Sequence, residues 1–136
     1  MAGSTGPNVI DDGLIFAIDA ANKKSYPGSG TSITDLGGNG VVGTLTNGPT
    51  FNSTNNGSIV FDDVNDYITF GNTSTLNFEW NDPHSIEVWL KRSNSGGSYI
   101  VGKNESSGNY RGTEFTFSGA NTTLAGTLTV GGDTSF

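Results

Sequence analysis

The sequence has no cysteine and few basic residues, and each shortage excludes classes of function. Without cysteine there is no disulfide framework, no thiolate metal site and no cysteine nucleophile. The chain contains six Lys and Arg residues and thirteen Asp and Glu residues, which gives a net charge of −7. Because nucleic-acid binding needs clustered cations, we expect no nucleic acid among the partners. The acidity also disfavours anionic membrane surfaces, so we expect no membrane partner.

Long apolar runs and a recognisable targeting signal are also missing from the 136 residues. No stretch approaches the roughly 18 apolar residues of a membrane-spanning helix. The first seven residues have neither the basic region nor the apolar run of a signal peptide. We therefore expect either another export route or assembly in the cytoplasm with release by lysis. The missing disulfides favour a bacterial or phage origin.

Small and turn-forming residues dominate what is present. Gly, Ser, Thr and Asn make up half of the chain. Glycine costs about 1 kcal/mol per helical position, and Ser and Asn compete for backbone hydrogen bonds. This composition excludes long helices and predicts many short strands joined by tight turns. The apolar residues are 32% of the chain and include eight Phe and two Trp in alternating clusters, so we expect a folded chain rather than a disordered one.

Period-two alternation predicts where the strands lie. Strands are expected at residues 13–20, 41–46, 58–61, 67–70, 85–91 and 98–102. Residues 58–70 are expected to form a hairpin, and residues 22–40 a long loop. Turns are expected at Asn55-Asn56-Gly57 and at residues 93–97. The clearest alternation is at 85–91, where the two faces carry Ile86, Val88 and Leu90, and Glu87, Trp89 and Lys91.

Four blocks of the sequence, in this order, resemble a known family. Residues 13–22 with 25–30, residues 35–40 with 43–51, residues 58–68 and residues 85–91 are similar to laminin-G-like, concanavalin-A-like lectin domains of phage and bacterial surface proteins. The resemblance covers about residues 13–103 and implies an all-β, antiparallel jelly-roll β-sandwich. The family's later strands are not recognisable, so the sandwich is expected to be incomplete. Residues 122–136 resemble the glycine-punctuated repeats of phage tail-fibre shafts.

This resemblance implies a domain organisation and a function. We expect an N-terminal arm at 1–12, a sandwich at 13–112, and a C-terminal β-segment or the start of a fibre-like repeat at 113–136. The segment carries too few apolar residues to fold alone, so it must pack on the sandwich or on copies of itself. The implied function is a non-enzymatic virion appendage, a phage fibre or a capsid or tail decoration. It would be a homotrimer on the virion surface or outside the cell, with capsid or tail proteins as partners. The alternative is a carbohydrate-binding adhesin module of a secreted bacterial protein.

Aromatic residues are the candidates for carbohydrate binding. Sugar faces stack on exposed aromatic rings, and we single out Trp89, Tyr67 and Tyr99 for contact with a cell-surface glycan. The competing interpretation places Trp89 in the core of the sandwich or in a subunit interface.

A cluster of acidic and amide residues is the candidate metal site. Asp62, Asp63, Asn65 and Asp66 crowd one predicted turn and carry the oxygen atoms that Ca²⁺ prefers. Their spacing is not that of an EF-hand. The competing interpretation is ordinary Asx-turn chemistry, in which the side chains cap the backbone of the turn.

Catalytic residues are not recognisable in the sequence. A glycosidase needs two carboxylates across the scissile bond, whereas Glu87 has Trp89, not a second acid, as its same-face neighbour. His84 is the only histidine and has no triad partners nearby in sequence. We therefore predict that the protein is not an enzyme.

Overall fold

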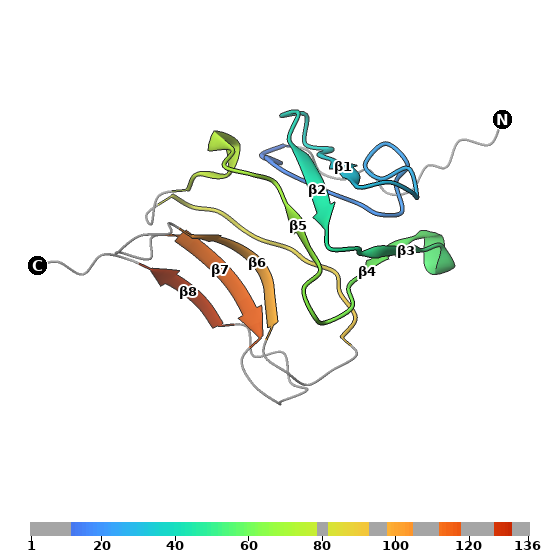
Figure 1. Ribbon diagram of the computed structural model, residues 1–136. Coiled ribbons are helices and arrows are strands. Elements are labelled where there is room, and N and C mark those ends of the chain that lie inside the picture. The colour runs from blue at the N-terminus through green and yellow to red at the C-terminus, as the bar shows by residue number, and fades with distance from the viewer. Residues whose placement is uncertain (1–11, 79–81, 93–97, 105–111, 118–126, 132–136) are drawn as a thin grey trace, which may run out of the picture. The chain divides into compact units, whose positions relative to one another are not determined.

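The computed structural model describes residues 12–78, 82–92, 98–104, 112–117 and 127–131. The chain divides into two compact units, Met1–Asn77 and Phe78–Phe136, and each is described by itself. Among the described residues, the regular elements are strands and two short 3-10 helices (Figure 1). The prediction of short strands without long helices is confirmed, and the described part of the chain is all-β.

The first unit holds seven of these elements in chain order. They are β1 (Ser32–Thr34), β2 (Val42–Thr46), β3 (Thr50–Asn52), η1 (Thr54–Asn56), β4 (Ser58–Val60), β5 (Tyr67–Thr69) and η2 (Ser74–Leu76). β1, β2 and β5 form one antiparallel sheet in that order, and β3 pairs with β4 in a second. The sheets are small, in keeping with strands of three to five residues.

The core of the first unit lies on the inner face of the three-stranded sheet. Ile33, Leu45 and Tyr26 are buried there, and four partly buried side chains pack against them: Phe51, Ile59, Ile68 and Phe70. Leu45 stands opposite Ile68 in the register, and Ile33 stands opposite Gly43. A Cβ at position 43 would collide with the Phe70 ring and with the Ile33 side chain, so this position requires glycine.

The turn between β3 and β4 has the geometry that its residues indicate. Asn55 and Asn56 have φ of 55° and 72°, and Gly57 has φ of 132°. Asparagine and glycine tolerate these left-handed conformations better than other residues. The predicted turn is confirmed, and it brings Phe51 opposite Ile59.

The predicted hairpin at 58–70 is wrong in its pairing. β4 and β5 form close to the predicted residues, but β4 pairs with β3 and β5 pairs with β2. The short Asn-Asn-Gly turn gives β4 a nearer partner upstream. The loop that follows β4 then carries the chain to the edge of β2.

Two further corrections concern the chain before β2. Residues 14–19 form no strand ladder, although a strand was predicted at 13–20. Conversely, β1 lies inside the predicted loop 22–40, where Ile33 is the one apolar residue of its strand. The alternation of apolar residues at 13–20 suggested a strand that does not form. β1 is too short for alternation to be detected.

A buried carboxylate explains why residues 14–19 form no strand ladder. Asp35 is 7% exposed, and its Oδ1 accepts hydrogen bonds from the N–H of Ala17 at 2.9 Å and of Gly37 at 2.7 Å. Its Oδ2 accepts from the Asn39 N–H at 3.1 Å. Asn39 in turn donates through Nδ2 to the carbonyl of Ile15 at 2.7 Å. These bonds satisfy the backbone of residues 14–19 without a neighbouring strand.

A buried hydroxyl fixes the end of the same stretch. The Ser25 side chain donates to the Thr34 carbonyl at 2.7 Å and accepts from the Asp19 N–H at 3.1 Å. The Thr34 N–H donates to the Ser25 carbonyl at 2.8 Å. Polar side chains thus attach the stretch before β1 to the C-terminal end of that strand, at Thr34 and Asp35.

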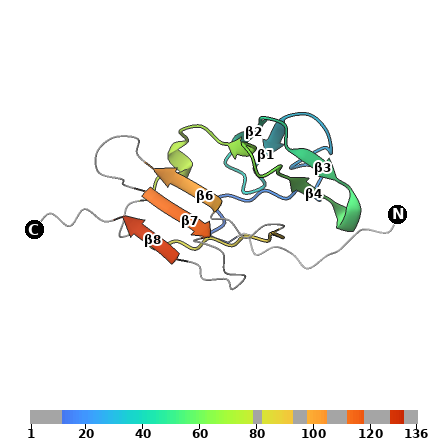
Figure 2. The same ribbon diagram turned by 60° about the horizontal axis from the view of Figure 1, so that its bottom comes forward.

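The second unit contains one regular sheet. Its strands are β6 (Ser98–Asn104), β7 (Gly112–Phe117) and β8 (Thr127–Gly131). They are antiparallel neighbours in this order (Figure 2). The predicted strand at 98–102 is confirmed. β7 and β8 belong to the predicted C-terminal β-segment, apart from Gly112. β7 pairs with β6, and β8 pairs with β7. The predicted turn at 93–97 and nearly all of the predicted arm at 1–12 lie outside the described residues.

We expect Asp35→Ala to destabilise the first unit. The substitution leaves three backbone N–H groups without their acceptor, at a cost of about 3 kcal/mol in the free energy of unfolding. Urea denaturation followed by circular dichroism measures the loss. Asp19→Ala is the matched control, because Asp19 accepts from the Ala21 N–H in an exposed turn and its removal costs about 0.5 kcal/mol. Equal effects of the two substitutions would contradict the assigned role of Asp35.

Candidate functional site

Among the residues that the structure describes, the most exposed aromatic side chain lies on a stretch outside the strand ladders. We call residues 83–92 the Trp89 segment. None of its residues belongs to a ladder among the described strands, although a strand was predicted at 85–91 (Figure 1). The alternation remains visible, because the Trp89 Nε1 donates to the Glu87 Oε1 at 2.9 Å, which places these two side chains on one side. The segment therefore has the side-chain pattern of a strand without the pairing.

Both faces of the Trp89 segment are open. The apolar face carries Ile86, Val88 and Leu90, whose side chains are between 36% and 43% exposed. On the other face Trp89 is 91% exposed. The interpretation of Trp89 as a core residue is not what the structure shows. A large ring in this position is suited to contact with a ligand or with another protein chain.

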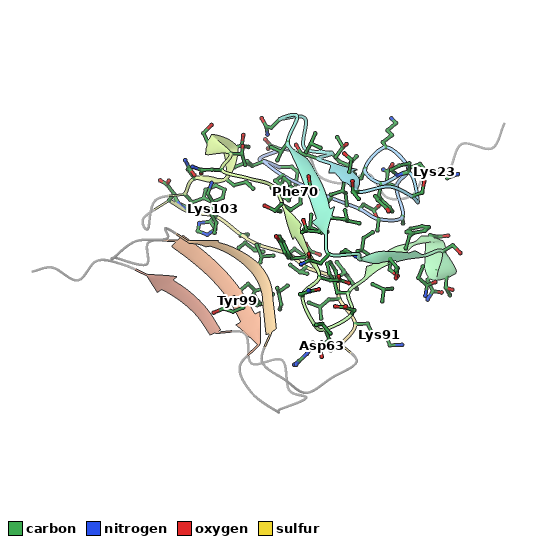
Figure 3. The ribbon with its side chains drawn as sticks, in the orientation of Figure 1. Lys23, Asp63, Phe70, Lys91, Tyr99 and Lys103 are labelled. Atoms are coloured by element: carbon green, nitrogen blue, oxygen red, sulfur yellow. The ribbon has the colours of Figure 1, made fainter. Side chains whose placement is uncertain are left out.

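The other two aromatic candidates are also exposed, but on different elements. Tyr99 is 78% exposed near the start of β6, opposite Thr116 (Figure 3). Tyr67 opens β5 in the first unit, opposite Thr46. The three predicted sugar-binding residues thus belong to three separate stretches in two units.

A row of hydroxyl groups was not anticipated from the sequence. Ser32, Thr44 and Thr69 stand opposite one another across β1, β2 and β5, and all three are exposed. Tyr67 and Thr46 lie on the same outward face, one step along the strands. The alternation of Thr44 and Thr46 is a signal for this face, but the row depends on the pairing of three strands. It is a polar, uncharged surface suited to hydrogen bonds with neutral groups.

The acidic turn (residues 62–66) contains the four predicted metal ligands. The Asp62 Oδ1 accepts from the N–H of Val64 at 2.9 Å and of Asn65 at 3.3 Å. The Asp66 Oδ2 accepts from the Asp62 N–H at 3.0 Å. Asp63 has a φ of 66° and lies at the far end of the loop between β4 and β5 (Figure 3). The bond from the Val64 N–H to Asp62 is that of an Asx-turn, the competing interpretation of the cluster, and the bond from the Asp62 N–H to Asp66 closes the loop.

The geometry does not add a cation site to this turn. Within the described ranges, no three acidic or histidine side chains gather closely enough to hold a metal ion. The Asp66 Oδ1 is buried and has no hydrogen-bond partner. Calcium binding by Asp62, Asp63, Asn65 and Asp66 stays a prediction.

The residues considered for catalysis have local structural contacts. The His84 ring stacks on Phe78, with centroids 4.8 Å apart and planes at 12°. Its Nδ1 lies 3.0 Å from the Asp82 carbonyl oxygen. Glu87 accepts the indole N–H of Trp89. Each of these contacts positions a side chain of the second unit.

Comparison of the chain with protein-family models, with curated proteins and with solved structures gives no match. Among the residues that the structure describes, no helix has the length and apolar character needed to cross a membrane.

The acidic turn is expected to weaken at low pH. The backbone N–H of Val64, followed by that of Asn65, lowers the pKa of Asp62 below its ordinary value, against the opposing effect of burial. Because the folded-state pKa is the lower one, the contribution of Asp62 is complete above the unfolded-state pKa. It is lost as the pH falls through the folded-state pKa.

An NMR titration of the Asp62 carboxyl carbon measures this effect. The midpoint in the folded chain is expected below the midpoint of the same resonance in the urea-unfolded chain. Equal midpoints would show that the Val64 and Asn65 bonds do not persist in solution.

Proposed function

We propose that this chain is a non-enzymatic structural subunit of a virion-surface appendage, a fibre or a capsid or tail decoration, that assembles with copies of itself. The observation that supports it most is the Trp89 segment, where large apolar side chains face solvent on both sides of an unpaired stretch. Monomeric proteins rarely leave such a surface open, because apolar area gains free energy when it leaves water. Association with another chain would cover it.

The proposed architecture is a laminin-G-like jelly-roll sandwich. Short antiparallel strands and exposed glycine and asparagine turns are compatible with it. The resemblance of four sequence blocks within residues 13–103 to that family supplies the rest of the argument. The partners in this proposal are capsid or tail proteins, and the site of action is the virion surface.

The absence of enzymatic activity is part of the same proposal. Glu87, the acid on the Trp89 segment, is engaged by an indole N–H, and its same-face neighbours are Trp89 and Ser85. A paired-carboxylate mechanism needs a second acid within several Å of the first. The sequence of this chain offers no second acid next to Glu87.

Light scattering on a sizing column tests the assembly. The chain is expected to elute with the mass of an oligomer, and the fibre-like C-terminal segment predicts a trimer. A monomer at every concentration would overturn the proposal. The same run with EDTA tests calcium: dissociation would show that assembly needs a divalent cation, and an unchanged mass would show that assembly needs none.

Carbohydrate binding is a second candidate function, favoured by the exposure of Trp89. Its indole edge is held by Glu87, so the ring presents a flat face without needing to be ordered on binding. A lectin-like fibre would combine both functions, since an appendage that carries a sugar site attaches a particle to a cell-surface glycan.

A glycan array followed by affinity measurement tests this second function. Trp89→Ala is expected to lower the affinity for any glycan that binds by about fivefold or more, because stacking on an aromatic ring contributes about 1 kcal/mol. Val64→Ala, an exposed apolar change in the first unit, is the control and should leave binding unchanged. The absence of any bound glycan would remove carbohydrate binding as a function.

A further inference from the structure

We propose that the Trp89 segment pairs with the same segment of a second copy, as two antiparallel strands centred on Trp89. The inference rests on the proposed self-assembly and names its interface. The segment has three properties that pairing requires: alternating side chains, backbone outside every described ladder, and exposure of both faces. An unpaired strand-like stretch is a template for another strand.

Charge complementarity identifies the second copy as the partner. In an antiparallel pair centred on Trp89, each residue stands opposite the one equally far on the other side of position 89. Glu87 of each copy then lies opposite Lys91 of the other, and the two Trp89 rings meet at the axis. The interface therefore contains two cross-strand pairs of opposite charge and one aromatic pair, all on one face. The Glu87 carboxylate has a second oxygen free of the indole bond, because the structure uses Oε1 for Trp89.

The opposite face of this pair is apolar at its centre. A two-fold axis perpendicular to the plane of the two strands keeps the same residues of both copies on the same face. Val88 of each copy stands opposite Leu90 of the other, and at both ends of the patch Ile86 stands opposite Arg92. Side chains that are open in the single chain thus form one continuous surface, which can pack further in an assembly.

Neighbouring registers are less favourable. Centring the pair on Val88 places Glu87 opposite Trp89 and leaves Lys91 opposite Ser85, without an ion pair. Centring it on Glu87 brings two carboxylates together, which is destabilising. Centring it on Leu90 places Lys91 opposite Trp89 and again loses both ion pairs. The sequence of the segment therefore selects the register centred on Trp89.

The strength of the association follows from its size. A strand pair of this length buries less surface than the roughly 1,600 Å² of a standard interface, so we expect a dimer that dissociates on dilution. This stoichiometry differs from the trimer that the fibre-like segment predicts, and the measured mass separates the two.

Charge reversal across the axis is the first test. Glu87→Lys places Lys opposite Lys twice, and Lys91→Glu places Glu opposite Glu twice. Each single variant is expected to weaken the dimer by about tenfold or more, measured by light scattering over a dilution series. The double variant restores both pairs and is expected to dimerise like the unmodified chain. A mixture of the two single variants should form a dimer of one chain of each variant, because Lys then stands opposite Glu at both positions. This mixed dimer should be tighter than the dimer that either variant forms alone.

A cross-link is the second test and needs no charge change. Trp89→Cys places one cysteine of each copy at the axis, and the chain has no other cysteine. Mild oxidation is expected to produce a covalent dimer. Ser85→Cys is the matched control, because the two copies of position 85 lie at opposite ends of the pair and should remain uncoupled.

The outcomes separate this inference from the proposed function. An oligomer whose mass is the same in Glu87→Lys and Lys91→Glu, and that gives no Trp89→Cys cross-link, would place the interface elsewhere. That result overturns the strand pair and leaves self-assembly standing. A chain that is monomeric at every concentration overturns both. Rescue by the double variant, with a cross-link at position 89 and none at 85, supports the pairing and its register.

Discussion

The buried carboxylate of Asp35 holds the first unit together. It accepts hydrogen bonds from the backbone N–H groups of Gly37 and Asn39, which follow it in the chain, and of Ala17 in the stretch before β1, at distances of 2.7–3.1 Å. The loss of a buried acceptor leaves the N–H groups that faced it without a partner, which costs their full desolvation penalty. The position of residues 14–19 against β1 depends on this group, and so does the contact of Phe16 with Phe70, whose ring centroids lie 4.8 Å apart.

The two units differ in how much of their apolar surface they bury. The first gathers Ile33, Leu45 and Tyr26 and closes its polar backbone with Asp35 and Ser25. The second contains a three-stranded sheet and an extended stretch whose apolar side chains are exposed. A short chain buries only part of its apolar surface by itself, and association with further chains is a common way to bury the remainder.

Trp89 is the proposed contact residue both for a glycan and for a second copy of the Trp89 segment. A sugar face and a second copy of the segment would both cover the same ring, so an assembled strand pair leaves little of it for a glycan. The residues around it distinguish the two, because stacking on a sugar does not involve Lys91, whereas the strand pair does. Tyr67 and the hydroxyl row on β1, β2 and β5 belong to the other unit and are compatible with either use.

Sequence reasoning succeeded where structure is local. The strands predicted at 41–46 and 98–102 form as β2 and β6, and the Asn-Asn-Gly turn forms as predicted, because alternation and left-handed residues act over a few positions. The acidic turn was located correctly for the same reason. What the sequence by itself determined is an all-β, acidic, cysteine-free chain with a strand-like pattern at 85–91. The tertiary structure decided that β4 pairs with β3, that Asp35 replaces a strand ladder, and that Trp89 is exposed. Pairing and burial result from competition between segments far apart in the chain, and alternation along one segment carries no information about which partner wins.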